Sequence, residues 1–323
     1  MNLSRTRFFL LTATLWLACF SASWAQFPDR PVRILVGAAA GGPTDIVARL
    51  ISDNLSKGLG RAVIIENKAG AGGNIATQTL ATAAPDGYTL LMGSFANAVN
   101  PAMMSVPYDT RRDLIPISQI TSVPLVVVAH KGAPYTNIAE LVAEARKRPG
   151  TINIASGGIG TSSHLAAELF KRNAGVDMQI IHYKGGAPAL QDLLAERAQV
   201  FFDNPQTSMQ FVKAGSIKLL AVTTAARLPY LPTTPTVAES PGFTGFEVIS
   251  WHGIFGRAGT PAEVVNRLSR EITTAMSSKD VRERFTQLQL DPVGSQPEEF
   301  NRFFSREMDV WGKVVREGNI KAE

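Results

Sequence analysis

Six loop stretches contain the residues of this chain that are best suited to binding a small molecule. Each follows a short apolar run and carries hydroxyl, amide or other polar side chains, and five of the six also contain glycine. Glycine lets the backbone approach a ligand closely, and the first N–H groups of a helix carry the positive end of its dipole. Such stretches favour carboxylates or phosphates. In chain order they are Gly37–Asp45, Gly70–Asn74, Gly93–Asn97, Ser156–Ser163, Tyr183–Gly186 and Asp203–Pro205.

The side chains in these stretches have two interpretations each. Tyr183 could close over a bound ligand or only pack against its neighbours. Asp203 ends the apolar run Val200–Phe202 and would repel a carboxylate. It therefore indicates either a ligand that also carries an amine or hydroxyl, or a buried acceptor for backbone amides. Four further side chains could donate hydrogen bonds to a carboxylate or could only cap helices. They are Ser94, Asn97, Thr161 and Ser162.

The motifs of nucleotide binding and of catalysis are missing from the sequence. In the stretch Gly70–Ile75, isoleucine stands where the dinucleotide fingerprint needs its third glycine. No G-x-x-x-x-G-K-[ST] loop and no G-x-S-x-G nucleophile elbow occur. The four histidines show no metal-ligand spacing. We therefore expect no catalytic residue, no metal ion and no cofactor, and interpret the chain as a binding protein rather than an enzyme.

The elements that must position these stretches follow from the apolar pattern. Short β-branched runs alternate with helical patterns, which predicts βαβ units in an α/β fold with mainly parallel sheets. Eight strands are many for one small sheet, so we expect two sheets. The predicted strands are Val32–Val36, Val63–Glu66, Tyr88–Met92, Leu125–Ala129, Ile152–Ala155, Gln179–His182, Val200–Asp203 and Leu219–Thr223.

The C-terminal third is almost wholly helical by pattern. Thr260 and Glu263 predict a capping box that begins one helix. Ser295 and Glu298 predict a second capping box, ahead of an aromatic run at helical spacing that we interpret as core.

The first 25 residues form a predicted signal peptide. Arg5 and Arg7 precede the apolar run Phe8–Phe20, and Ser23-Trp24-Ala25 is a small-x-small cleavage site. An uncleaved anchor and a lipoprotein signal at Cys19 are the alternatives. Because Cys19 is the only cysteine, the mature chain has no disulfide.

The charge balance gives no indication of nucleic-acid binding. The whole chain has 32 Lys and Arg against 27 Asp and Glu, a net charge of +5. The predicted signal peptide contains two arginines and no acidic residue. The mature chain therefore has a net charge of only +3, and it has no basic run. We expect no nucleic-acid partner.

Several motifs in order resemble the Bug family, the extracytoplasmic receptors of tripartite tricarboxylate transporters. The similarity extends from about residue 27 to the C-terminus. The motifs are Phe27–Val36 (FPDRPVRILV), Gly41–Asp45 (GGPTD), Glu66–Gly73 (ENKAGAGG), Pro85–Leu90 (PDGYTL), His182–Gly186 (HYKGG) and Pro235–Glu239 (PTVAE).

The resemblance implies a periplasmic binding protein-like fold whose two lobes are joined by crossing hinge strands. Residues 26–124 with 250–323 would form lobe 1, and residues 125–249 lobe 2. The crossings are expected near Ser122–Leu125 and Ile249–Gly253.

The same resemblance implies a periplasmic monomer that binds a small carboxylate between the lobes and delivers it to the membrane components of a transporter. Family ligands are di- and tricarboxylates, amino acids or aromatic acids. A receptor for a periplasmic signalling partner is the alternative. The ligand-binding positions implied are Gly41, Gly42, Thr44, Asp45, Gly72, Gly73, Ser94, Asn97, Thr161, Ser162, Tyr183 and Asp203. The first loop departs from the family pattern, which commonly has proline ahead of the glycines.

Overall fold

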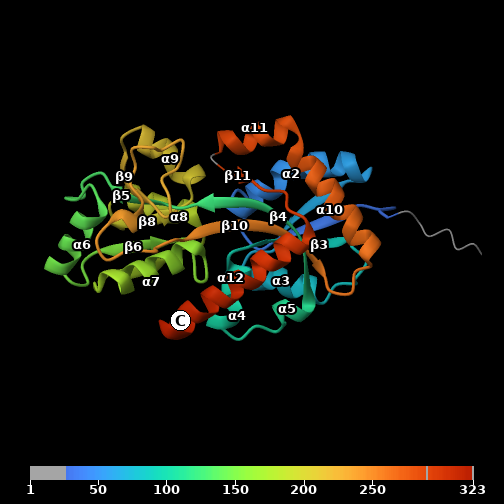
Figure 1. Cartoon of the computed structure of the whole chain (residues 1–323), viewed down its shortest axis with the longest axis horizontal. Helices are drawn as coiled ribbons and strands as arrows, with labels where there is room; N and C mark the ends of the chain where they lie inside the picture. The colour runs from blue at the N-terminus through green and yellow to red at the C-terminus, as the bar shows by residue number, and fades with distance from the viewer. Residues whose placement is uncertain (1–26, 289, 322–323) are drawn as a thin grey trace, which may run out of the picture.

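The computed structural model describes residues 27–288 and 290–321, and the predicted signal peptide lies outside these ranges. The chain forms two lobes side by side, with long strands running between them (Figure 1). Each lobe is built on its own sheet. The sheet of lobe 1 has the strand order β11-β4-β10-β3-β1-β2. Its strands are β1 (Val32–Val36), β2 (Val63–Asn67), β3 (Thr89–Ser94), β4 (Leu114–Pro124), β10 (Ile249–Arg257) and β11 (Asp291–Pro292).

Lobe 2 has a five-stranded sheet in the order β7-β6-β8-β5-β9. The strands are β5 (Val126–His130), β6 (Asn153–Ser156), β7 (Gln179–His182), β8 (Val200–Asp203) and β9 (Ile217–Val222). All eight predicted strands are thus present, within a few residues of their predicted bounds. The boundaries of the lobes along the chain, at residues 124–125 and 249–250, remain our proposal.

Both sheets are mixed, whereas the sequence predicted mainly parallel sheets. Parallel pairing joins β1 to β2 and β3 in lobe 1, and β6 to β7 and β8 in lobe 2. The remaining pairs, those of β4, β5, β9, β10 and β11, are antiparallel. The reason is that the chain crosses to lobe 2 through β4 and returns through β10, so these two strands run in opposite directions.

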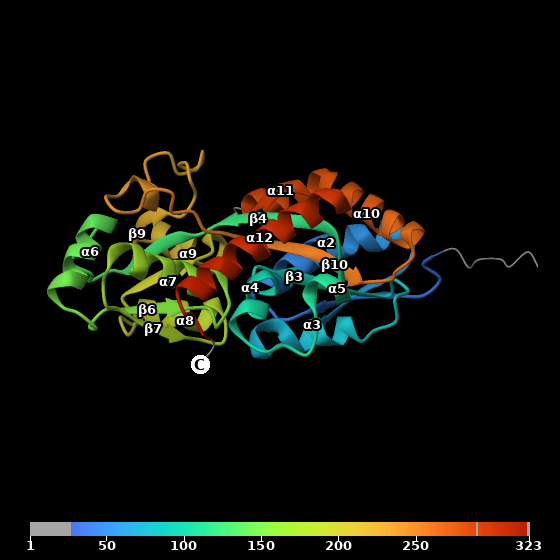
Figure 2. The same cartoon turned by 60° about the horizontal axis from the view of Figure 1, so that its bottom comes forward.

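Helices cover both faces of the two sheets (Figure 2). In lobe 1 they are α2 (Pro43–Leu59), α3 (Asn74–Ala81), α4 (Ala96–Met103), α5 (Thr110–Asp113), α10 (Ala262–Ser277), α11 (Lys279–Gln287) and α12 (Pro297–Glu317), with the 3₁₀ turn η1 (Ala71–Gly73) ahead of α3. In lobe 2 they are α6 (Ile138–Lys147), α7 (Ser162–Ala174), α8 (Gly186–Leu194) and α9 (Pro205–Lys213), with the 3₁₀ turn η2 (Val237–Glu239) after β9. No helix within residues 27–288 and 290–321 is long and apolar enough to cross a membrane.

The two C-terminal helix starts differ from the predicted capping boxes. Thr260 donates to the Arg257 carbonyl at 2.6 Å, and α10 begins without a side-chain cap. The second box is shifted by one residue, to Gln296 and Glu299. Ser295 cannot cap α12 because its hydroxyl accepts the Gln119 N–H at 2.9 Å, a tertiary contact that the local sequence does not reveal.

The aromatic run of α12 packs beneath the crossing strands, as predicted for core residues. Trp251 of β10 is fully buried and lies edge-on to Phe300 and Phe304, with ring centroids 5.9 and 5.7 Å away. The indole N–H groups of Trp251 and Trp311 both donate to Glu307, at 3.0 and 3.3 Å. Burial raises the pKa of Glu307, and these two hydrogen bonds partly oppose the rise.

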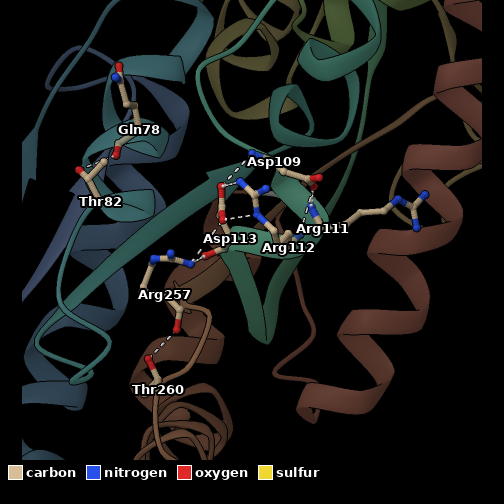
Figure 3. A network of polar contacts seen from close by, with 8 residues as sticks. All are labelled: Gln78, Thr82, Asp109, Arg111, Arg112, Asp113, Arg257 and Thr260. Atoms are coloured by element: carbon tan, nitrogen blue, oxygen red, sulfur yellow. Dashed lines mark hydrogen bonds and ion pairs between the residues drawn. The ribbon is translucent and has the colours of Figure 1, made fainter.

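An ionic network fixes the outer ends of the crossing strands (Figure 3). Asp113 lies just before β4 and accepts from Arg112 at 3.0 and 3.1 Å and from the Asp109 N–H at 2.9 Å. The carbonyl of Asp113 accepts from the Arg257 guanidinium at 2.8 Å, which ties it to the end of β10. The pKa of Asp113 is lowered to about 2, mainly by the hydrogen bonds from Arg112.

The inner ends are tied by one buried hydroxyl. Thr223, which follows β9, is fully buried and lies where both crossings pass from lobe to lobe. Its Oγ1 accepts the Leu125 N–H at 3.1 Å and donates to the Val248 carbonyl at 2.6 Å. The backbone N–H of Thr223 also donates to Leu125 at 3.0 Å. One side chain therefore links the outgoing and the returning segment.

Replacing this hydroxyl should weaken the whole molecule. Thr223→Val keeps the shape but leaves the Leu125 N–H and the Val248 carbonyl without their side-chain partner, so we expect a loss of about 1–3 kcal/mol. Urea unfolding measures this difference. Thr224→Val is the control, because that hydroxyl makes one exposed hydrogen bond, to Ala226. Equal unfolding of the two variants would show that the Thr223 bonds add no stability.

Candidate functional site

The six stretches singled out in the sequence each lead into a helix. Three belong to lobe 1 and precede α2, α3 and α4, and three belong to lobe 2 and precede α7, α8 and α9. The carboxyl ends of parallel strands meet at one edge of a sheet, so β1, β2 and β3 bring the first three stretches to the same edge. β6, β7 and β8 do the same in lobe 2.

Close backbone contacts show that the stretches within a lobe lie side by side. In lobe 1, a Cβ added to Gly37 would lie 2.7 Å from the Cα of Gly73. In lobe 2, a Cβ on Gly157 would lie 3.6 Å from the Gly186 N, and one on Gly186 would lie 3.4 Å from Asp203 Oδ1. Glycine at position 37 therefore lets the neighbouring backbone approach, apart from any ligand, whereas the space at Gly157 would admit a Cβ in ordinary contact.

Most of the helix starts at this site have no side-chain cap. The N-terminal N–H groups of a helix have no acceptor within the helix, and a side chain at the N-cap usually accepts one of them. Five of the six helices have no such side-chain cap, and only α7 is capped, by Thr161. The arrangement favours an anion because each start also carries the positive end of the helix dipole.

Asp45 shapes the first loop from beneath. It is buried, and its carboxylate accepts from the Gly41 N–H at 2.8 Å, the Arg49 guanidinium at 2.9 Å and the Asn67 amide at 2.9 Å. Burial by itself raises the pKa of Asp45, but the hydrogen bond from Arg49, aided by Gly41 and Asn67, outweighs it and lowers the pKa. All these contacts are internal, so Asp45 positions the loop.

The other predicted residues of the first loop lie on its surface and at the helix start. Gly41 is exposed and adopts a φ of +79°, a conformation that favours glycine. Gly42 is the N-cap of α2, and Thr44 is half-buried in the first turn. These three lie where a ligand would meet the helix N-terminus.

Asn97 holds the second and third stretches together. Its Oδ1 accepts the Ser94 N–H at 2.8 Å, and its Nδ2 donates to Thr77 Oγ1 at 2.8 Å. Thr77 in turn donates to the carbonyl of Gly73 at 3.0 Å. Both polar groups of Asn97 therefore have partners within lobe 1, and Gly72 and Gly73 are held in place through them.

In lobe 2, the residues of the fourth stretch bond mainly to one another. Thr161 accepts the His164 N–H at 3.3 Å and donates to the Gly158 carbonyl at 2.6 Å. Ser163 accepts the Gly157 N–H at 2.8 Å, and Ser162 is buried in the first turn of α7. The stretch is thus a pre-formed loop with its backbone fixed.

Tyr183 is anchored within its own lobe. Its hydroxyl donates to Asp192 near the C-terminal end of α8 at 2.7 Å, which anchors the ring to that helix. Burial raises the pKa of Tyr183 to about 12, and the hydrogen bond to the Asp192 carboxylate adds to this rise.

Asp203 is buried beneath the lobe 2 stretches. Its Oδ2 accepts short hydrogen bonds from the hydroxyls of Thr207 and Ser208, while Oδ1 faces Gly186. Burial raises the pKa of Asp203 to about 6, and the hydroxyl bonds only partly oppose this. Its partners within the chain are the two α9 hydroxyls and the backbone N–H of Asn204, and a contact with the amine or hydroxyl of a ligand stays a prediction.

Within residues 27–288 and 290–321, three amide side chains that were not among the predicted site residues carry buried atoms without a hydrogen-bond partner. They are Asn100 Oδ1, Asn204 Oδ1, and both Oε1 and Nε2 of Gln206. A buried amide group without a partner costs free energy, so each of these atoms needs a structural explanation. Asn204 lies within a stretch that the sequence identified. Asn100 and Gln206 carry no local signal, since they sit inside helices.

The family follows from comparison with known proteins. The family model of the tripartite tricarboxylate transporter family receptor matches residues 47–320. The chain belongs to this family. The structure of the periplasmic binding protein BugD is 35% identical, with a TM-score of 0.85, and the similarity covers 92% of this chain and 100% of BugD. The predicted Bug resemblance and the two-lobe α/β fold are thereby confirmed.

Two further relatives of this receptor have small acids in their structures. An R. palustris protein with adipate is 34% identical, with a TM-score of 0.86, over 91% of this chain and 99% of the other. MatC from Rhodopseudomonas palustris with bound malate is 32% identical, with a TM-score of 0.81, over 90% and 100%. Family and neighbours are solute-binding receptors, which confirms the prediction of a binding protein rather than an enzyme. In the part of the receptor that the structure describes, no cluster of three His, Cys, Asp or Glu residues could hold a metal.

The pH dependence of stability tests the burial of Asp203. The pKa of Asp203 in the folded protein, about 6, lies above the usual 3.8. The stability that the protonated Asp203 contributes is therefore fully present below about pH 4 and is lost as the pH rises through 6. Asp203→Asn lacks this loss, so its stability relative to wild type should increase by up to about 3 kcal/mol between pH 4 and 8.

Thermal or urea unfolding across that range measures the effect. Asp192→Asn is the matched control, because the hydrogen bond from Tyr183 lowers the pKa of Asp192 and its contribution to stability changes only below about pH 4, so its difference from wild type should stay flat across this range. A flat difference between wild type and Asp203→Asn would show that the carboxyl is hydrated rather than buried.

Proposed function

We propose that this receptor captures a small carboxylate between its lobes in the periplasm and delivers it to the membrane components of a tripartite tricarboxylate transporter. The ligand is a di- or tricarboxylate, an amino acid or an aromatic acid. The proposal includes cleavage of the leader after Ala25, which leaves a mature chain of residues 26–323. We further propose that this mature chain acts as a monomer.

The helix starts at the two facing edges are the observation that carries the proposal. Five uncapped N-termini supply N–H donors and positive dipole ends. The six stretches contain a single basic side chain, that of Lys184, which is exposed. An anion would therefore be held by N–H donors and neutral amides. The relatives with adipate and malate support a carboxylate as that anion.

The unpaired amides of α9 add a second contact point. Gln206 offers both a donor and an acceptor, and Asn204 offers an acceptor. Both residues lie at the start of α9 beside the lobe 2 stretches. We propose that these groups bind the part of the ligand that faces lobe 2, in addition to the twelve positions implied by the family resemblance.

Thermal unfolding against a panel of acids tests the binding. The mature chain, refolded to remove any carried ligand, is heated with dicarboxylates, tricarboxylates, amino acids and aromatic acids in turn. A ligand at 100 times its Kd should add about 2.7 kcal/mol to stability. A selective shift supports the proposal and gives the ligand class. No shift with any acid, together with no co-purified acid in mass spectrometry, contradicts it.

A charge placed on α9 tests the lobe 2 contact. Gln206→Glu puts a carboxylate at the proposed site, and like charges repel, so affinity for the selected acid should fall by about tenfold or more. Gln210→Glu makes the same change one turn later at an exposed position, where affinity should stay within about twofold of wild type. Isothermal titration compares the two. Equal affinities would remove Gln206 from the site.

A further inference from the structure

The two lobes touch at more than one place away from the crossing strands: α12 reaches α7 through the Arg172–Glu317 ion pair, and the loop stretches of the two lobes meet each other. A Cβ added to Gly72 in lobe 1 would lie 3.2 Å from the Ile159 carbonyl oxygen in lobe 2. Beside this contact, the side chain of Asn100 in lobe 1 lies against Gly160 in lobe 2 so closely that a Cβ on Gly160 would overlap Asn100 Oδ1. The contact joins α4 to the loop before α7, so it exists only while the lobes are together.

Asn100 is fixed on the lobe 1 side. It is 1% exposed, and its Nδ2 donates to the Gly72 carbonyl at 3.0 Å and to Asn74 Oδ1 at 2.9 Å. Asn74 Oδ1 also accepts the Tyr108 hydroxyl at 2.6 Å. Because both Nδ2 hydrogens have acceptors, the amide cannot turn over without losing them. Oδ1 is held toward lobe 2.

Gly160 is fixed on the lobe 2 side. Its N–H donates to His164 Nδ1 at 3.2 Å, and Thr161, the next residue, begins α7 as its N-cap. Its φ is +76°. The loop is held by its own hydrogen bonds, so neither side of the contact can give way to an added methyl group.

We propose that Asn100 and Gly160 form the closure contact of this receptor. The lobes can meet there because residue 160 has no side chain. The pair acts as positioning residues that set ligand retention. Closure also removes water from Asn100 Oδ1, which has no hydrogen-bond partner. This desolvation disfavours the closed state and leaves the ligand to supply the difference in free energy. The effect on ligand affinity rests on the proposed function, but the contact itself does not.

Gly160→Ala is the direct test, with Gly245→Ala as its matched control. Gly245 is also in lobe 2 and has a φ of +77°, but a Cβ there meets nothing within 4 Å. Both variants bear the same backbone strain, and only Gly160→Ala blocks closure. We expect Gly160→Ala to weaken binding of the selected acid by about tenfold or more, mainly through faster dissociation, and Gly245→Ala to stay within about threefold of wild type.

Closure can also be measured without any ligand. The mature chain has no cysteine, so Ala71→Cys and Ile159→Cys give a unique thiol pair across the contact. A short bismaleimide traps the closed state whenever the free protein visits it. The trapping rate should fall by about tenfold or more in Gly160→Ala and remain near wild type in Gly245→Ala.

Removing the opposing atom should rescue the variant. In an Asn100→Ala background the overlap is absent, so adding Gly160→Ala should change trapping by less than about threefold. The closure contact is overturned if Gly160→Ala leaves the trapping rate unaltered. It is also overturned if Gly160→Ala lowers the trapping rate equally in the wild-type and the Asn100→Ala backgrounds. If trapping behaves as expected but no acid binds wild type, the contact stands and the proposed function fails. Folding of each variant is checked by its unfolding transition.

Discussion

The antiparallel pairing of β4 with β10 is the constraint on which the rest of the receptor depends. Its register runs from Leu114 opposite Arg257 to Pro124 opposite Ile249, so both lobe connections leave lobe 1 as neighbours. The Asp113 network holds one end of this pair and Thr223 the other. Because the connections are adjacent and hydrogen-bonded, bending there moves one lobe relative to the other as a unit.

Glycine at two kinds of position serves this arrangement in different ways. Gly253 of β10 leaves the space that the ring of Phe300 fills, so α12 can pack tightly beneath the crossing strands. Gly160 leaves the space that Asn100 fills where the lobes meet. The first contact lies within lobe 1, whereas the second lies between the lobes and in our proposal acts only in the closed state.

The polar groups of the candidate site divide into two classes with separate tasks. Asp45, Asn97 and Thr161 each form a hydrogen bond with the backbone of a neighbouring loop, which keeps the glycine segments in one conformation. In our proposal the helix N–H groups, together with Asn204 and Gln206, are among the groups that meet the ligand. A preorganised site of this type binds an anion without a buried arginine or lysine, and so avoids the large cost of desolvating an unpaired cation.

The sequence by itself determined eight of the strands, the six loop stretches that follow β1, β2, β3, β6, β7 and β8, and the family, because these depend on local apolar patterning and motif order. It did not show the full extent of β4, where Pro116 and the polar run Ser118–Thr121 interrupt the apolar pattern. Partners far along the chain bury those residues: β10 pairs with β4, and Ser118 donates to the Ser295 carbonyl.

Tertiary structure alone decided which side chains hold the loops in place and which side chains have atoms without a hydrogen-bond partner. Asp45 and Asn97 were predicted to bind ligand, and their hydrogen bonds became visible only once Asn67 and Thr77 were placed beside them. Asn100 and Gln206 look like ordinary helical residues, and their unpaired atoms depend on what surrounds them in space. Local sequence encodes the strands and loops because their periodicity is short-range, but whether a polar group finds a partner is settled only by contacts between distant segments.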